Sequence, residues 1–194
     1  MKAVKWSIVI VGGLLALFVI ITFFLPREYH VERSVEISAP RAIIYTQVSD
    51  LKLWQEWNPW NEMDPEMALT FSEPAFGVGA WYEWRSEIAG DGRMSIVKAT
   101  PREKISFELI FEGYESDPSF SSFILEGSGM TDPVQVTWTF EGSVGDKFFG
   151  RWMTLMIDKF VGSSYEKGLQ SLKDRCEAME VSSMDLSGIK SPEG

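Results

Sequence analysis

The sequence predicts an α+β domain in which a strongly curved, seven-stranded antiparallel sheet wraps one long C-terminal helix, preceded by a single transmembrane helix. Three observations lead to this prediction. An uncharged apolar stretch opens the chain, short alternating segments fill its middle, and a long apolar stripe at helical spacing follows them. The expected organisation is an anchor at 1–28, the domain at 29–180 and a disordered tail at 181–194.

The apolar stretch from Trp6 to Leu25 carries no charge, and about twenty such residues are enough to cross the hydrocarbon core of a bilayer. A cleaved signal peptide is the alternative, but Phe23-Phe24-Leu25-Pro26 lacks the small residues of a cleavage site. Lys2 and Lys5 precede the stretch, whereas the charges just after it cancel. The positive-inside rule therefore predicts a cytoplasmic N-terminus and a domain on the extracytoplasmic side, periplasmic or extracellular.

Seven short segments of the central region have apolar residues at alternate positions, which is typical of half-buried strands. They are 29–37, 67–72, 80–88, 93–99, 105–112, 120–126 and 134–141. Turn residues such as Gly90-Asp91-Gly92 separate the later segments by hairpin lengths, so neighbouring strands are expected to pair antiparallel.

Two short helices are predicted between the first and second strands. Ser38 is a suitable N-cap for a helix that continues to Ser49, and Asp50 is suitable for a second helix at 51–57. Pro59 disfavours the helical conformation at the residue before it, so the second helix should end there.

The segment 148–179 predicts one long amphipathic helix, with a kink or close packing at Gly162-Ser163-Ser164. Its apolar stripe recurs every three or four residues. The stripe consists of Phe149, Trp152, Met153, Met156, Phe160, Val161, Tyr165, Leu169, Leu172, Cys176 and Met179.

Composition excludes several classes of function. The formal net charge of −10 and the pI near 4.7 make a nucleic-acid partner unfavourable, because the chain repels phosphate backbones. One cysteine, Cys176, and one histidine, His30, exclude an internal disulfide and a cysteine-based metal cluster, so we predict no metal and no cofactor. Eight Trp and thirteen Phe are more than a plain core requires and suggest a lined cavity.

Several separated blocks resemble the polyketide cyclase/dehydrase branch of the SRPBCC (START-like) superfamily over about residues 29–177. The blocks are Trp57-Asn58-Pro59-Trp60, Met63-Asp64-Pro65, Gly77-Val78-Gly79-Ala80 with Tyr82 and Trp84, Val136-Thr137-Trp138-Thr139-Phe140-Glu141-Gly142 and Tyr165-Glu166-Lys167-Gly168-Leu169. The resemblance implies the helix-grip fold, with a hydrophobic cavity between the sheet and the long helix. It implies binding of lipids, sterols, polyketides or other apolar ligands, catalysis in a minority of members, and no catalytic residues to carry over.

Large side chains on the expected concave face and on the helix stripe are the candidates for ligand binding, with packing as the alternative role for each. Three tryptophans spaced by three could form a lip at the cavity mouth. The candidates are Trp54, Trp57, Trp60, Tyr82, Trp84, Met94, Phe107, Phe111, Phe123, Trp138, Phe140, Trp152, Met156 and Phe160.

No residue pattern indicates a catalytic site. Glu83 and Glu87 are expected on the outer face as solvated charges, Asp158 projects away from the helix stripe, and His30 lies at the start of the first strand. We therefore predict a membrane-anchored domain that binds a hydrophobic small molecule or lipid. Two alternatives stay open: a cyclase- or dehydratase-like enzyme with the same cavity, or a tethered interaction module with a packed core. The oligomeric state also stays open.

Overall fold

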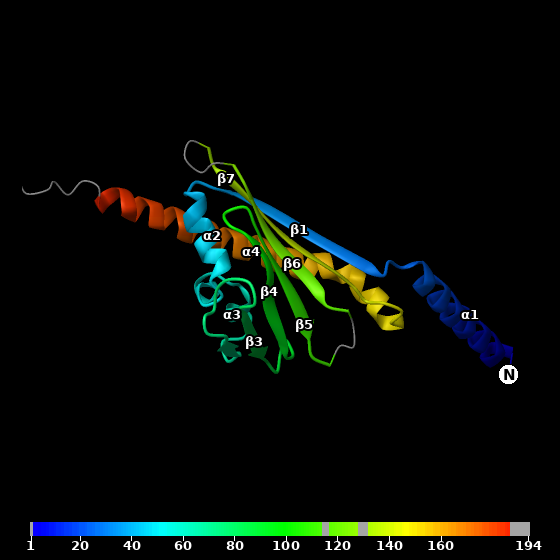
Figure 1. The fold of residues 1–194 in the computed structure, drawn as a ribbon. Helices are drawn as coiled ribbons and strands as arrows, with labels where there is room; N and C mark the ends of the chain where they lie inside the picture. Colours follow the sequence, from blue (N-terminus) through cyan, green and yellow to red (C-terminus); the bar gives the residue numbers. More distant parts are fainter. Residues whose placement is uncertain (1, 114–116, 128–131, 187–194) are drawn as a thin grey trace, which may run out of the picture.

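The structure is a computed structural model that describes the backbone of residues 2–113, 117–127 and 132–186 and the side chains of 6–7, 9–113, 117–127 and 132–179 (Figure 1). Its helices and strands follow one another in the order α1 (Lys2–Phe24), β1 (Glu28–Ile37), α2 (Arg41–Ser49), the 3₁₀ helix η1 (Leu53–Glu56), α3 (Trp60–Met63), β2 (Ala68–Phe71), β3 (Trp81–Arg85), β4 (Gly92–Thr100), β5 (Lys104–Phe111), β6 (Ser119–Glu126), β7 (Val134–Ser143) and α4 (Phe148–Leu186).

The seven strands form one antiparallel sheet in the order β1-β7-β6-β5-β4-β3-β2. Strands β2 to β7 follow one another as hairpins, and β1 returns to pair with β7, with Val31 opposite Phe140. The curved sheet lies against α4, which crosses its concave side (Figure 1). The predicted seven-stranded antiparallel sheet with a long C-terminal helix is therefore confirmed.

Helix α1 projects from one end of the sheet and meets the beginning of α4. The rings of Phe18 and Trp152 stack with their centroids 4.7 Å apart, and the Trp152 indole donates a hydrogen bond to the Thr22 hydroxyl (2.8 Å). The side chain of Arg151 is buried there and donates to the main-chain oxygens of Thr22 and Phe23. These contacts fix the end of α1 against α4.

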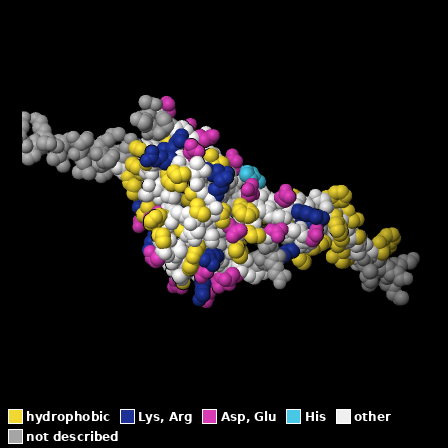
Figure 2. Space-filling model, in the orientation of Figure 1, with side chains coloured by type: hydrophobic (Ala, Val, Ile, Leu, Met, Phe, Trp, Pro, Cys, Tyr) yellow, Lys and Arg dark blue, Asp and Glu magenta, His cyan; other side chains and the backbone are white. Residues whose placement is uncertain are grey.

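The apolar side chains of α1 are exposed and gather at one end of the molecule (Figure 2). Among the residues whose side chains are described, no helix combines the length and the hydropathy that a bilayer crossing requires. The structure thus does not support the transmembrane anchor expected at 1–28. Membrane attachment and the orientation of the domain stay predictions.

The short helices differ from expectation in their capping. Pro40 rather than Ser38 precedes α2, and no side chain caps the helix; the Ser38 backbone N–H donates to the Glu177 carboxylate on α4 (2.8 Å). The segment expected as a helix at 51–57 contains only the 3₁₀ turn η1. The additional helix α3 begins directly after Pro59, since proline is tolerated where a helix starts and its missing N–H is not needed.

Helix α4 is longer than expected: it continues beyond Met179 to Leu186, so the tail predicted from residue 181 begins inside the helix. Residues 187–194 lie outside the described residues. Close packing accounts for its glycines. A Cβ at Gly168 would lie 2.9 Å from both the Pro59 ring and the Trp138 ring, and one at Gly162 would overlap the Arg33 guanidinium. Helix α4 can therefore approach the sheet and the α3 segment closely.

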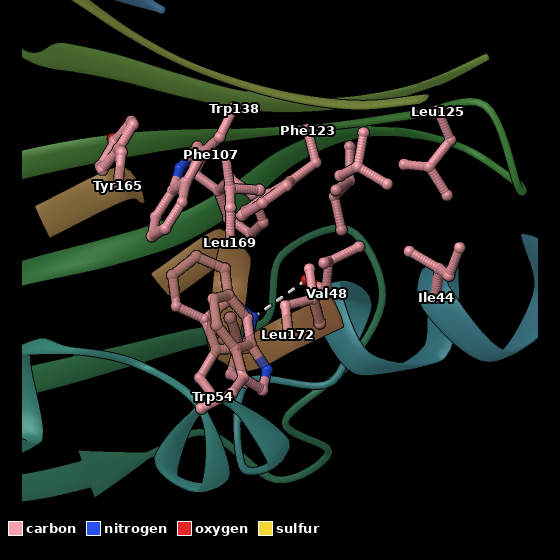
Figure 3. Close-up of a cluster of buried hydrophobic side chains, with 14 of the residues drawn as sticks. Ile44, Val48, Trp54, Phe107, Phe123, Leu125, Trp138, Tyr165, Leu169 and Leu172 are labelled. Atoms are coloured by element: carbon pink, nitrogen blue, oxygen red, sulfur yellow. Dashed lines mark hydrogen bonds between the residues drawn. The ribbon is translucent and has the colours of Figure 1, made fainter. Parts of the chain in front are cut away.

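The core lies between the sheet, α2, η1 and the C-terminal half of α4 (Figure 3). Side chains at alternate positions of β6 point inward, and on this strand the side chain of Phe123 is completely buried. The ring of Trp54 meets Phe107 and Phe123 edge to face, and its indole N–H donates to the main-chain oxygen of Val48 (3.1 Å). This filled core closes one end of the space between sheet and helix.

Candidate functional site

A pocket of about 400 Å³ occupies the other end of the space between the concave face and α4. Its walls come from the sheet, the N-terminal half of α4 and the segment 51–61, and they are mostly apolar. Its volume falls within the range of small-molecule sites. Eight of the residues predicted from the sequence line it: Trp54, Trp60, Tyr82, Trp84, Met94, Phe111, Trp138 and Phe140.

A single row of residues across the sheet forms the floor of the pocket. Neighbouring strands pair Phe71 with Tyr82, Tyr82 with Met94, Met94 with Leu109 and Leu109 with Ser119. All five side chains line the pocket. The row passes from large side chains on the outer strands to a serine on β6, and the small serine leaves room at the centre of the sheet.

The six other predicted residues lie elsewhere. Phe107, Phe123 and Trp57 are buried in the packed core. Trp152 packs against α1.

Met156 and Phe160 are exposed on α4, with 51% and 63% of their surface accessible. Helix α4 instead contributes Met153 and Val161, which belong to the predicted stripe, and Ile157, which does not. The difference arises because the pocket-facing side of α4 is rotated slightly from the side that the stripe indicated.

Two hydroxyl clusters interrupt the apolar wall. The Tyr29 hydroxyl and the Ser119 hydroxyl are 2.7 Å apart. The Trp138 indole donates to the Ser121 hydroxyl (2.9 Å), which also lies 3.3 Å from the Tyr165 hydroxyl. Strands β1 and β6 and helix α4 thus bring two pairs of hydroxyl groups to the pocket, and β7 adds the Trp138 N–H.

The electrostatics of the pocket favour neutral groups. Burial raises the pKa of the Tyr82, Tyr165 and Tyr29 phenols above the usual value for tyrosine; the Ser121 and Ser119 hydroxyls partly offset the rise for Tyr165 and Tyr29, respectively. All three phenols are therefore protonated at neutral pH. Among the described residues, no carboxylate or imidazole lines the pocket, and its one ammonium group belongs to Lys147, which is exposed at the rim. The described lining thus combines apolar side chains with neutral hydroxyl groups, and its one charged group lies at the rim.

Sequence reasoning missed the polar part of the wall: Tyr29, Ser119, Ser121 and Tyr165. Ser119 and Ser121 continue the inward alternation of Phe123, which is the signal that could have identified them. Tyr165 belonged to the predicted helix stripe without being assigned to the cavity. The contribution of β2 through Leu69 and Phe71 was also missed.

Comparison with known proteins agrees with the architecture. The chain matches the sequence profile of the family described as polyketide cyclase / dehydrase and lipid transport over residues 28–177. No curated protein matches the chain.

Solved structures share the fold at low identity. A protein from Thermobifida fusca, solved by NMR in solution, has a TM-score of 0.58 at 18% identity, covering 78% of this chain and 95% of its own. The di-domain ARO/CYC StfQ from the steffimycin biosynthetic pathway has a TM-score of 0.57 at 12% identity, covering 84% and 53%. The Aha1 dimer from Colwellia psychrerythraea has a TM-score of 0.53 at 21% identity, covering 76% and 96%.

The family match spans β1 to β7 and α4 as far as residue 177, which is the sheet and the helix that enclose the pocket. The chain belongs to the polyketide cyclase/dehydrase and lipid transport family.

Proposed function

We propose that the protein binds a hydrophobic small molecule or lipid in the pocket between the sheet and α4. One observation carries the proposal: an apolar pocket of about 400 Å³ lies beside a tightly packed core. Because protein interiors are normally close-packed, an open space of this size is unusual in a plain core. The residues that line it would contact a bound ligand. The pocket also distinguishes this proposal from the interaction module with a packed core, which needs no such space.

Binding is favoured over cyclase or dehydratase chemistry because of the groups in the wall. A general acid or base works best with a pKa near the operating pH. The pocket tyrosines have raised pKa values, and Lys147 at the rim is exposed. The family includes cyclases and dehydrases, so turnover of a polyketide-like substrate is the alternative that an activity assay would reveal.

The test is the binding of a neutral fluorescent probe, N-phenyl-1-naphthylamine, to the delipidated full chain. Ile157 and Met156 provide a matched pair on α4, since Ile157 lines the pocket and its neighbour is exposed. Ile157→Trp places a large ring in the pocket and should reduce probe affinity at least about tenfold, whereas Met156→Trp should leave it unchanged. Probe taken up by α1 or by detergent is the same in both variants, so the difference between them reports the pocket.

Equal binding to the native protein and to Ile157→Trp would refute the proposal. Extraction of the purified native protein with organic solvent, followed by mass spectrometry, would then identify any molecule that the pocket carries. A co-purified apolar molecule should be absent from Ile157→Trp and present in Met156→Trp.

We also propose that α1 attaches the domain to a lipid bilayer. Large apolar side chains are exposed on every side of this helix. A helix that binds in a protein groove usually keeps one polar face toward water, and the described side chains of α1 form no such face. Contiguous exposed apolar surface of this extent is rare on monomeric soluble proteins and often marks an interaction site. The packing of Phe18 on Trp152 would hold the pocket near the bilayer.

Flotation of the full chain with phosphatidylcholine vesicles tests the attachment. We expect the native chain to float with the vesicles and the variant Val9→Asp/Leu14→Asp/Ile20→Asp to remain at the bottom of the gradient. The altered residues are exposed and do not contact α4 through any ring stacking or hydrogen bond. Equal flotation of both proteins would contradict attachment through α1.

A further inference from the structure

The hydroxyl groups of the pocket wall have more protons to donate than the protein has acceptors for them. In the Tyr29–Ser119 pair, two hydroxyl protons serve one hydrogen bond. In the second cluster, the Trp138 N–H occupies one lone pair of Ser121, and the Ser121 and Tyr165 hydroxyls share one further bond. Each cluster therefore has one proton without an acceptor among the described residues.

Tyr82 adds a third hydroxyl. It faces the pocket from β3, and its oxygen makes no hydrogen bond with any described residue. The described side-chain atoms that are both inaccessible and without a hydrogen-bond partner do not include this oxygen. The Tyr82 oxygen is therefore accessible from the pocket. Tyr82 lies in the same row across the sheet as Ser119, and its side chain lines the same pocket as Tyr29 and Tyr165.

The charged residues around the pocket determine which charge a ligand can carry next to the hydroxyl groups. Arg33 on β1 and Arg151 on α4 are engaged with Asp158, Glu166 and the main chain of α1, and no arginine is among the described residues that line the pocket. A buried anionic group would have no cation beside it, and a buried cation would have no carboxylate. A neutral oxygen can accept the spare hydroxyl protons without this cost.

We propose that the spare hydroxyl protons at Tyr29, Tyr82 and Tyr165, with Ser119 and Ser121, make this part of the pocket wall a binding site for a neutral oxygen group, a ketone, ester or alcohol oxygen, of an otherwise apolar ligand. This inference rests on the proposed function, because it names the class of molecule that the same pocket selects. The apolar wall contacts the hydrocarbon part of the ligand, and the hydroxyl site determines the orientation in which the ligand binds.

The experiment measures displacement of pocket-bound N-phenyl-1-naphthylamine by four molecules of equal chain length: 2-decanone, 1-decanol, decanoate at pH 8 and decane. The native protein should bind the ketone and the alcohol about tenfold more tightly than decanoate or decane. Tyr82→Phe removes a pocket hydroxyl that makes no hydrogen bond with any described residue, so this change breaks no hydrogen bond within the described part of the chain. It should weaken ketone binding about three- to tenfold and leave decane and the probe unchanged.

Tyr45→Phe is the matched control, because Tyr45 is a half-buried tyrosine of α2 outside the pocket. It should leave all four affinities unchanged. Two results would overturn the hydroxyl site while leaving the apolar pocket in place. One is an unaltered ketone affinity in Tyr82→Phe; the other is displacement of the probe by decanoate at concentrations as low as those needed for the ketone. Failure of the probe itself to distinguish the native protein from Ile157→Trp would instead overturn the proposed function and this inference together.

Discussion

The indole of Trp138 on β7 and the phenol of Tyr165 on α4 stack face to face, with ring centroids 3.7 Å apart and planes 9° from parallel. Both side chains also reach the same hydroxyl, that of Ser121 on β6. The contact joins two strands and the helix at the boundary between the packed core and the pocket. Loss of either ring would therefore affect both the sheet–helix packing and the shape of the site.

Ser121→Ala should destabilise the protein by about 1–3 kcal/mol, because it leaves the buried Trp138 N–H without an acceptor. Tyr165→Phe keeps the stack and the Trp138–Ser121 bond, so it should cost about 1 kcal/mol or less. Ser122→Ala is the control, since Ser122 bonds to Ser106 rather than to a group of the pocket. Urea unfolding followed by tryptophan fluorescence measures all three. Equal losses in Ser121→Ala and Ser122→Ala would contradict the assigned role of Ser121.

The alternation of apolar residues was sufficient to predict all seven strands, because each strand has one face in the core and one toward water. The same reasoning identified α4, whose stripe continues through Leu169, Leu172 and Cys176 into full burial. Periodicity could not define η1 and α3, because each is only about one turn long; η1 lies within the helix predicted at 51–57, and α3, which follows Pro59, was not predicted.

The pocket was only half predictable for a related reason. Alternation shows which side chains point inward, but it does not show which inward residues touch one another and which leave space. Phe111 and Phe107 lie on the same face of β5, yet the first lines the pocket and the second is packed under Trp54. The space depends on the small side chains of Ser119 and Ser121, which a search for large apolar residues passes over.

Two glycines of α4 allow a matched test of its close packing. Gly168→Ala would bring a methyl group to within 2.9 Å of the Pro59 and Trp138 rings, neither of which can move freely. The expected loss is about 1–3 kcal/mol, although alanine alone would favour the helix by about 1 kcal/mol. Gly162→Ala would displace only the end of the flexible Arg33 side chain.

For Gly162→Ala, the weakened ion pairs of Arg33 with Asp158 and Glu166 are largely exposed, and such pairs contribute about 0–1 kcal/mol. The gain in helix propensity is of similar size, so the variant should lie within about 1 kcal/mol of the native protein. Thermal and urea unfolding of the two variants provide the comparison. A larger loss for Gly162→Ala than for Gly168→Ala would show that the helix contacts the sheet differently.

Cys176, the only cysteine of the chain, reports on the packing of the C-terminal half of α4. Its side chain is fully buried, and burial raises the pKa of the thiol to about 12. Because the thiolate is the reacting form, 5,5′-dithiobis(2-nitrobenzoic acid) at pH 8 should modify the native protein very slowly and the urea-unfolded protein at once. Immediate reaction of the native protein would mean that this part of α4 opens readily from the sheet.

The pocket tyrosines predict a loss of stability in alkaline solution. Burial raises the pKa of Tyr82 and Tyr165 in the folded protein, while in the unfolded chain each phenol has its usual pKa of about 10. Above that pH the unfolded chain releases protons that the folded protein retains, so the unfolding free energy should fall as pH rises. Below about pH 9 these groups should make no pH-dependent contribution.

Urea unfolding between pH 7 and 11 measures the slope of the unfolding free energy against pH. Tyr82→Phe removes one of the pocket phenols with a raised pKa and should make the slope shallower. Tyr45→Phe removes a less enclosed phenol, whose pKa burial also raises, and should change the slope less. An identical slope in Tyr82→Phe and the native protein would show that this hydroxyl ionises freely, and the pocket would then be open to water at the point where a neutral oxygen group is expected to bind.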